Sequence, residues 1–370
     1  MTLIKSISGI RGTIGGKPGE GLSPLDVVKF TSAYAEWLKK QSSGPLSVVV
    51  GRDARISGMM VENLVTSTLS GMGIDVINLG LSTTPTVEVA VPLENANGGI
   101  ILTASHNPKQ WNALKLLNDK GEFISGEDGK DLLEIAERED FSYSEVDDLG
   151  EITEKNNYFD IHIQEILKHE LVDVNAIKSA NFKVAIDAVN STGGLVLPQL
   201  LKALGVEKVY ELFCEPNGQF PHNPEPLPEN LTEISKTVIE NNANIGLVVD
   251  PDVDRLALVC EDGSMFGEEY TLVAVADYIL SERVGNTVSN LSSTRALKDV
   301  TEKAGGEYFP AAVGEVNVVN KMKAQNAVIG GEGNGGVIFP DLHYGRDALI
   351  GIALILTHMA KTGKSPKQLR

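Results

Sequence analysis

The chain repeats one local order: an apolar run, a polar loop, a helical segment that ends near a glycine, and a second apolar run. Three copies of this order begin at Ser47, Lys183 and Asn286, and the third is the weakest. The copies are spaced too irregularly for a solenoid. Alternating strands and helices instead favour several similar α/β domains, in which helices cover mixed, mainly parallel sheets.

The first copy gives the clearest local predictions. Apolar content and flanking turns predict strands at residues 46–50, 75–79 and 98–102, and a helix at residues 59–72. An earlier helix is expected to start at Ser23-Pro24, because serine is a good N-cap and proline suits the first helical position.

The length of the chain and its linker-like and turn-forming segments divide it into domains. A chain of 370 residues is too long for one ordinary core. The acidic, polar stretch 137–157 is typical of a linker or an edge segment, residues 216–228 carry five prolines, and residues 261–264 form a hairpin-like turn. The expected domains are residues 1–150, 151–256 and 257–370.

Charge and composition exclude several classes of protein. The net charge of −18 disfavours a non-specific nucleic-acid binder. No apolar run approaches the roughly 20 residues of a membrane helix, and the N-terminus lacks a signal-peptide core, so we expect a cytoplasmic protein. Cys214 and Cys260 do not form a disulfide framework. We expect no nucleic-acid or membrane partner, and a monomer or weak homodimer.

A serine stands at the end of the strand predicted at residues 98–102. It lies in Thr-Ala-Ser-His-Asn-Pro, residues 103–108, where Asn-Pro turns the chain and His106 adjoins Ser105. An isolated Ser-His pair also fits a turn serine beside a backbone-bonded histidine. No G-x-S-x-G motif surrounds Ser105, which disfavours an esterase. A serine that accepts a phosphate group is the remaining functional interpretation, and it requires cations and a metal nearby.

Three aspartates follow a second apolar strand, residues 245–249. Asp250, Asp252 and Asp254 alternate along the chain, so they can wrap one small hard cation through oxygen ligands. A solvated acidic turn is the alternative. An EF-hand is excluded because Arg255 replaces the required glycine and the following residues are strand-like.

A glycine-rich loop occupies residues 330–336. Its glycines formally match G-x-G-x-x-G, but the strand-like segment that follows offers no helix N-terminus for a pyrophosphate. The loop instead presents Glu332 and Asn334 on a backbone that a ligand can approach closely, which suits sugar hydroxyls. A plain glycine-rich turn is the alternative.

A phosphate substrate would need local cations, because the overall charge repels anions. The candidates are predicted to lie in loops: Arg11, Arg52, Arg55, Lys115, Arg255 and Arg346. Arg255, beside the three aspartates, suits a phosphate oxygen.

Taken together, the motifs resemble the α-D-phosphohexomutase superfamily over the whole chain. In the family's order they are Ser-Gly-Ile-Arg-Gly from Ser8, Gly-Arg-Asp-x-Arg-x-Ser-Gly from Gly51, Thr-Ala-Ser-His-Asn-Pro, Asp-Pro-Asp-x-Asp-Arg, and Gly-Glu-x-Asn-Gly. The resemblance implies a phosphoserine at Ser105 that binds Mg²⁺ together with the three aspartates. It also implies phosphate transfer between hexose 6-phosphate and 1-phosphate through a bisphosphate, with an activator of the glucose 1,6-bisphosphate type.

The resemblance also implies roles for the other residues. Lys115, Arg11 and Arg255 would neutralise charge, and either His106 or Lys115 would move the proton. Glu332, Asn334, Arg255, Glu315 and Arg346 would bind the hexose or hexosamine phosphate. An amino sugar suits an acidic Glu315, which favours phosphoglucosamine mutase. Phosphomannomutase/phosphoglucomutase, or a serine-dependent metal phosphatase, is the alternative.

The resemblance implies a fourth domain whose serine-, threonine- and arginine-rich loop grips the distal phosphate. No such segment occurs in the 370 residues. We therefore expect three domains that hold Mg²⁺ and accept phosphate on Ser105 but turn over poorly.

Overall fold

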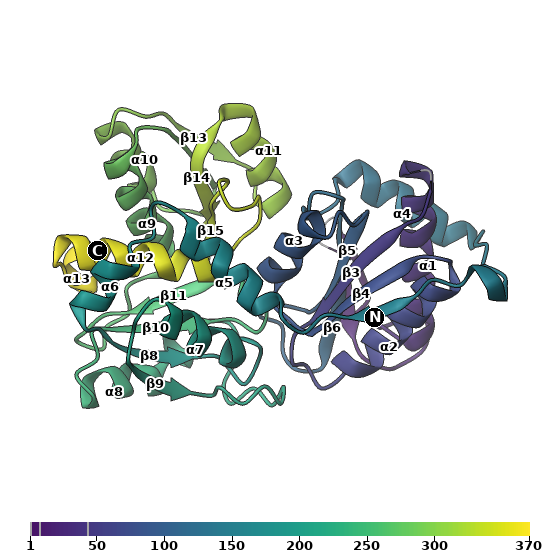
Figure 1. Ribbon diagram of the computed structural model, residues 1–370, viewed down its shortest axis with the longest axis horizontal. Helices are drawn as coiled ribbons and strands as arrows, with labels where there is room; N and C mark the ends of the chain where they lie inside the picture. Colours follow the sequence, from purple (N-terminus) through teal and green to yellow (C-terminus); the bar gives the residue numbers. More distant parts are fainter. Residues whose placement is uncertain (1, 7–8, 43) are drawn as a thin grey trace. The chain divides into compact units, whose positions relative to one another are not determined.

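The computed structural model describes residues 2–6, 9–42 and 44–370, and the chain divides into two compact units (Figure 1). Unit 1 comprises residues 1–159 and 217–219, and unit 2 comprises residues 160–216 and 220–370. Taken together, the two units contain three mixed sheets with packed helices, which confirms the predicted fold class.

Unit 1 is built on a seven-stranded sheet in the order β1-β2-β6-β5-β3-β4-β7. Its strands are β1 (Ile4–Ser6), β2 (Gly9–Thr13), β3 (Ser47–Arg52), β4 (Asp75–Leu81), β5 (Gly98–Leu102), β6 (Trp111–Leu117) and β7 (Ile152–Glu154). The half from β5 to β7 is parallel, whereas β1, β2 and β6 pair antiparallel.

Helices cover both faces of this sheet. They are α1 (Pro24–Gln41), α2 (Gly58–Gly71), α3 (Thr84–Leu93) and α4 (Gly126–Arg138), with the short 3₁₀ helix η1 (Val146–Asp148). α1, α2 and α4 bury one face, which includes Val48 and Leu114. α3 lies on the other face, where its Val87 and Val91 pack over the strand glycines Gly51 and Gly99.

The predicted start of the first helix is confirmed. Ser23 is the N-cap of α1, and Ser23 and Asp26 form a reciprocal capping box in which each side chain accepts a hydrogen bond from the other's backbone N–H. The strand predicted at residues 98–102 matches β5, and β3, β4 and α2 begin within one residue of their predicted starts. Strand β6 was not predicted, because Asn112 and Lys115 interrupt its apolar pattern although both are buried.

Unit 2 contains two four-stranded sheets, in the orders β11-β10-β8-β9 and β13-β12-β14-β15. The strands are β8 (Lys183–Asp187), β9 (Lys208–Leu212), β10 (Ile245–Val249), β11 (Leu256–Val259), β12 (Asn286–Asn290), β13 (Tyr308–Ala311), β14 (Ala327–Glu332) and β15 (Gly336–Ile338). In each sheet two strand pairs are parallel and one, formed by a hairpin, is antiparallel.

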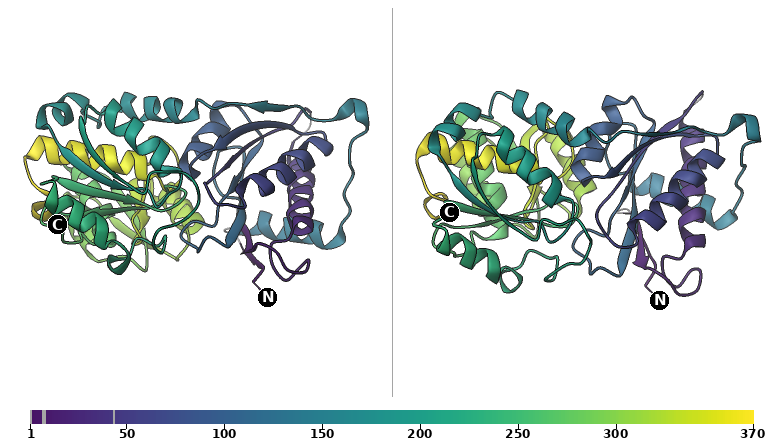
Figure 2. Two further views of the ribbon diagram at one scale, coloured as in Figure 1. Left: turned by 90° about the horizontal axis from the view of Figure 1, so that it is seen from below. Right: turned by 60° about the horizontal axis from the view of Figure 1, so that its bottom comes forward.

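One helix ties these two sheets together. α12 (Ala348–Thr362) packs against β11 of the first sheet and β15 of the second, and appears in yellow along the green strands (Figure 2). Nearly all of its residues are buried, as expected for a helix that is apolar on every side. The other helices are α5 (Tyr158–Lys168), α6 (Val174–Ala180), α7 (Gly193–Ala203), η2 (Pro228–Asn230), α8 (Thr232–Glu240), α9 (Glu268–Glu282), α10 (Ala296–Lys303), α11 (Glu315–Gln325) and α13 (Pro366–Leu369).

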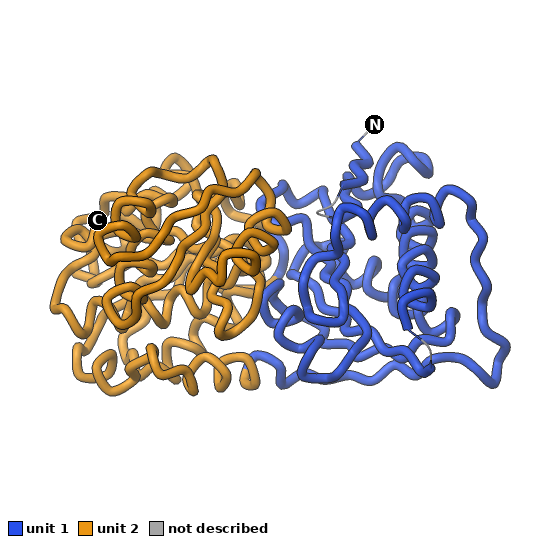
Figure 3. The backbone as a smooth tube through the Cα atoms, turned by 90° about the horizontal axis from the view of Figure 1, so that it is seen from above, with its two compact units in different colours: residues 1–159, 217–219 blue, residues 160–216, 220–370 orange. Residues whose placement is uncertain are grey.

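The division into units differs from the three expected domains (Figure 3). β7 pairs with β4 of the first sheet, although it follows residue 150. β11 pairs with β10, although it runs past residue 256. The domain boundaries at 150 and 256 stay a prediction. Among the described helices, none has the length and apolarity needed to cross a bilayer.

Two glycines of unit 1 should respond oppositely to alanine. A Cβ at Gly98 would lie 2.1 Å from the Tyr34 hydroxyl oxygen and 2.7 Å from the Leu117 carbonyl oxygen, so Gly98→Ala should lower the free energy of unfolding by about 1–3 kcal/mol. A Cβ at Gly129 in α4 meets no atom within 4 Å, so Gly129→Ala should raise it by about 0.5–1 kcal/mol. Urea unfolding of both variants measures this, and equal effects would contradict the packing described here.

Candidate active site

Ser105 stands just beyond the end of β5 in a left-handed turn. Its φ is 48°, a conformation that few residues other than glycine adopt. Its backbone N–H donates to Thr103 Oγ1 at 2.9 Å, and Thr103 Oγ1 in turn donates to Asp53 Oδ2 at 2.7 Å. Strained backbone of this kind clusters at functional sites.

A buried arginine fixes the shape of the serine loop. Arg55 is 1% exposed, and its Nε donates to Asp53 Oδ2 at 3.0 Å. Its other donors reach backbone carbonyls of the loop, namely those of Ser105, Asn107, Pro108 and Trp111. All five guanidinium N–H groups are therefore used inside unit 1.

This arrangement corrects the inclusion of Arg55 among the candidate cations for a phosphate substrate. Arg52 is corrected as well, because it ends β3 rather than lying in a loop, and its Nε donates to Glu62 at 2.7 Å. Sequence reasoning missed the positioning role of Asp53 and Arg55. The signal was present in the motif that starts at Gly51, whose charged residues directly follow a buried strand.

His106 adjoins the serine. Its Nδ1 lies 3.4 Å from Ser105 Oγ, which is longer than an ordinary hydrogen bond but within reach of a small adjustment. A potential proton acceptor thus sits beside the hydroxyl.

Lys115 and Arg11 lie on strands, not in loops as predicted. Arg11 of β2 is paired with Ala113 of β6, so Arg11 and Lys115 project from the same face as diagonal neighbours. This is the α3 face, where Lys115 Nζ lies 3.5 Å from Thr84 Oγ1. Two cations on one sheet face favour an anion there. Ser8, which opens the predicted motif around Arg11, lies outside the described residues.

The three predicted metal ligands of unit 2 converge in space. Asp250, Asp252 and Asp254 follow β10, each is fully buried, and one carboxylate oxygen from each lies within 4.8 Å of the others. Val253 between them has φ 64°, a rare conformation for a β-branched residue.

Neighbouring loops hold this turn in place. The hydroxyls of Ser191 and Thr192 both donate to the Pro251 carbonyl, at 2.6 and 3.0 Å. The Arg255 backbone N–H donates to Asp250 Oδ1 at 3.2 Å. Sequence reasoning missed Ser191 and Thr192, which end the polar loop of the second repeat just before α7.

The donor set fits a hard divalent cation. Three buried carboxylates offer only oxygen ligands, which Mg²⁺ prefers. The three carboxylates concentrate negative charge away from water, so a divalent ion would stabilise the cluster.

Arg346 joins this loop to the glycine-rich loop. Its Nη2 lies 2.7 Å from Asp254, its Nε 2.8 Å from Glu315, and its Nη1 3.1 Å from Glu332. Burial alone would lower the pKa of Arg346, but the charges of the three carboxylates raise it well above its ordinary value. The guanidinium therefore stays charged and braces the two loops.

The glycine-rich loop is a β14–β15 hairpin, not a helix entry. Glu332 ends β14, and its Oε1 accepts hydrogen bonds from Asn290 Nδ2 at 2.8 Å and from the Gly314 N–H at 3.2 Å. Asn334 lies at the hairpin tip, half-buried, and its Oδ1 accepts from the Gly336 N–H at 3.3 Å. Asn290, at the end of β12, is a supporting residue that sequence reasoning missed.

Arg255 and Glu315 have different surroundings. Arg255 is nearly buried and contacts Asp254 and Glu225 only at 4.0 Å, so its guanidinium is loosely held. Glu315 begins α11, and both its carboxylate oxygens accept from Arg346, one from the backbone N–H and one from Nε.

Comparison with known proteins identifies the family. Models of phosphoglucomutase/phosphomannomutase α/β/α domains I, II and III match residues 3–143, 160–263 and 267–370. A phosphoglucomutase/phosphomannomutase of Thermococcus kodakarensis is 36% identical, over 97% of this chain and 78% of its own length. The chain belongs to the α-D-phosphohexomutase superfamily.

Further relatives agree. A protein of Methanopyrus kandleri named "Probable phosphoglucosamine mutase" is 32% identical over 98% of this chain and 77% of its own length. The crystal structure of a phosphoglucomutase/phosphomannomutase family protein from Burkholderia thailandensis superposes with a TM-score of 0.86 at 28% identity, and the match covers all of this chain and 80% of that one. The predicted superfamily and class of enzyme, a phosphohexose mutase and thus an isomerase, are confirmed.

Removal of the Arg346 side chain should destabilise this phosphohexomutase. Arg346→Ala leaves Asp254, Glu315 and Glu332 buried without their shared cation, so the free energy of unfolding should fall by about 3–5 kcal/mol. Arg295→Ala is the matched control, because Arg295 pairs with one aspartate while 80% exposed and should change stability by less than about 1 kcal/mol. Urea unfolding distinguishes them, and a similar small loss in both would show that Arg346 does not brace the loops.

Proposed function

We propose that this chain interconverts hexose 6-phosphate and hexose 1-phosphate by carrying the transferable phosphate on Ser105. The observation that carries the proposal is the strained turn of Ser105, held from within by Arg55, in a chain of this superfamily. A hydroxyl fixed at the end of a strand is oriented for repeated phosphorylation and dephosphorylation.

The proposed cycle has two transfers. In the first, a hydroxyl of the hexose monophosphate attacks the phosphorus of phosphoserine 105, the bond from phosphorus to Oγ breaks, and a hexose bisphosphate forms. In the second, Ser105 Oγ attacks the other phosphate of the bisphosphate, which restores the phosphoserine and releases the isomeric monophosphate. An activator of the glucose 1,6-bisphosphate type would load Ser105 by the second transfer alone.

The proton and the charge need partners in each transfer. His106, with Nδ1 3.4 Å from Ser105 Oγ, and Lys115 are the two candidates for moving the proton. Lys115 and Arg11 project from one sheet face and would neutralise phosphate oxygens. Arg255, whose nearest carboxylates lie at 4.0 Å, is suited to a phosphate oxygen in unit 2.

Asp250, Asp252 and Asp254 would hold Mg²⁺ through their carboxylate oxygens. When bound, the ion supplies positive charge that stabilises the transferring phosphate.

The sugar would be read by the glycine-rich hairpin. Glu332 and Asn334 offer a carboxylate and an amide, which suit sugar hydroxyls. Arg346 would act mainly by positioning Glu332 and Glu315. The direct contact between Arg346 and the substrate that the family resemblance implies stays a prediction. The relative from Methanopyrus kandleri supports glucosamine phosphate as the preferred substrate, with glucose and mannose phosphates as alternatives.

The first test is phosphorylation of Ser105. Peptide mass spectrometry after incubation with glucose 1,6-bisphosphate and Mg²⁺ should locate one phosphate on Ser105, and Ser105→Ala should carry none. Addition of a hexose monophosphate should remove that phosphate and yield a bisphosphate. Release of inorganic phosphate instead would identify a serine-dependent phosphatase, and an unphosphorylated Ser105 would contradict the proposal.

The metal role has its own matched pair of variants. Asp252→Asn removes a buried ligand, so Mg²⁺-dependent phosphorylation of Ser105 should fall at least about 10-fold. Asp262→Asn, beyond the other end of β11, changes an aspartate that pairs with Lys367 at the surface and should leave the rate unchanged. Equal rates in both variants would show that Asp252 does not serve the metal.

Sugar preference can be measured in a single turnover. Phosphoserine 105 should lose its phosphate faster to glucosamine phosphate than to glucose or mannose phosphate. Glu315→Gln removes the negative charge that would favour the amino group, so it should reduce this preference by about 10-fold, equivalent to about 1.4 kcal/mol. An unchanged ratio would remove Glu315 from recognition while leaving the phosphoserine mechanism intact.

A further inference from the structure

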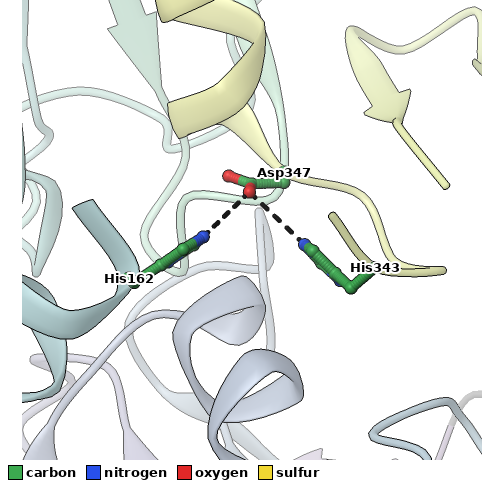
Figure 4. Close-up of side chains that lie close together, drawn as sticks. All are labelled: His162, His343 and Asp347. Carbon is green, nitrogen blue, oxygen red and sulfur yellow. Dashed lines mark hydrogen bonds and ion pairs between the residues drawn. The ribbon is translucent and has the colours of Figure 1, made fainter. Parts of the chain in front are cut away.

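A second cluster of metal-type ligands lies in unit 2, apart from the three aspartates. It consists of His162 on α5, His343 in the loop after β15, and Asp347, the N-cap of α12 (Figure 4). Sequence reasoning did not single out these residues, which are 181 and 4 positions apart along the chain. The mechanism proposed above does not use them.

The two imidazoles converge on one carboxylate oxygen. His162 Nε2 lies 3.1 Å and His343 Nε2 3.3 Å from the same atom, Asp347 Oδ2 (Figure 4). One donor atom from each of the three residues lies within 4.8 Å of the others. Zinc binds imidazole nitrogen and carboxylate oxygen at about 2.0–2.2 Å, so two ligands on a tetrahedral ion lie about 3.3–3.5 Å apart. The separations of the two imidazole nitrogens from Asp347 Oδ2 therefore need only a small outward shift.

The surroundings suit a bound cation. His162 and Asp347 are fully buried, and the His343 side chain is 8% exposed. The second oxygen of Asp347 is held by the α12 backbone, since Oδ1 accepts from the Leu349 N–H at 2.7 Å and the Ile350 N–H at 3.4 Å. Such outer contacts orient a carboxylate ligand.

The donor types select the metal. Two imidazoles and one carboxylate are borderline ligands, typical of Zn²⁺ and neighbouring transition metals, whereas Mg²⁺ prefers oxygen alone. The two clusters of unit 2 therefore differ in chemistry: three carboxylates in one, two histidines and one carboxylate in the other.

We propose that His162, His343 and Asp347 form a binding site for a divalent transition metal of the zinc class, distinct from the three-aspartate loop. The ion links α5 to the start of α12 through side chains that are far apart in sequence. The site adjoins the Arg346 brace in the chain, and the Ala348 N–H donates to the Val253 carbonyl of the three-aspartate loop at 3.2 Å. Its role is to hold the start of α12 rather than to act in phosphate transfer.

The test titrates Zn²⁺ into the full chain in excess Mg²⁺, which keeps the three aspartates occupied. Calorimetry should show one Zn²⁺ site, and Zn²⁺ should raise the Tm. His343→Ala should weaken this affinity by at least about 100-fold, because loss of an outer contact alone costs 10- to 100-fold. His169→Ala is the matched control, because His169 faces a single carboxylate, Asp341, at 3.4 Å, and its loss should leave the affinity unchanged.

A second measurement needs no variant. X-ray absorption of the Zn²⁺-loaded wild-type chain should show two imidazole ligands, and Co²⁺ in its place should give the strong visible absorption of a four-coordinate site. An all-oxygen shell, or equal Zn²⁺ affinities of wild type and His343→Ala, would overturn the proposal. The three residues would then be a hydrogen-bonded cluster that caps α12.

Discussion

The arrangement of unit 2 depends on one buried cation, Arg346. Its guanidinium contacts a carboxylate of the three-aspartate loop, one at the start of α11 and one in the glycine-rich hairpin. Three buried carboxylates would repel one another without it, and a buried guanidinium would be costly without them. The guanidinium and the carboxylates therefore stabilise one another's burial. The three-aspartate loop and the glycine-rich hairpin are linked through them and cannot shift independently. The proposed metal and sugar ligands inherit their geometry from this constraint.

Unit 1 also contains a buried arginine, Arg55, whose acceptors are mostly uncharged. Arg55 also directs its donors inward, and its guanidinium reaches four backbone carbonyls and the carboxylate of Asp53. The guanidinium thereby shapes a loop that forms no regular secondary structure between β5 and β6. The left-handed φ of Ser105 persists because the surrounding contacts fix it from both sides, through Arg55 and Thr103. Positioning by Arg55 and the chemistry proposed for Ser105 are thus divided between two motifs.

Both clusters of metal-type ligands in unit 2 lie close to α12. Val253, inside the three-aspartate loop, accepts a hydrogen bond from the first residue of α12, and Asp347 caps the same helix. A helix buried on nearly every side is a rigid support, since any movement would open cavities against two sheets. Such a support suits the proposed ligands at its N-terminus, where the helix dipole also favours a carboxylate.

The sequence by itself determined the α/β class, the strands that precede the serine loop and the three-aspartate loop, and the motifs that identify the superfamily. These are local features, because a turn after a buried strand is encoded by adjacent residues. Tertiary structure alone decided which cations hold loops in place. In the sequence alone, Arg55 and Arg346 look no different from the other candidate cations. Their partners, however, lie up to 92 residues away along the chain. It also decided that β6 is a strand, that Ser191, Thr192 and Asn290 support the loops, and that His162 meets His343, because burial and pairing at such separations depend on how the sheets pack.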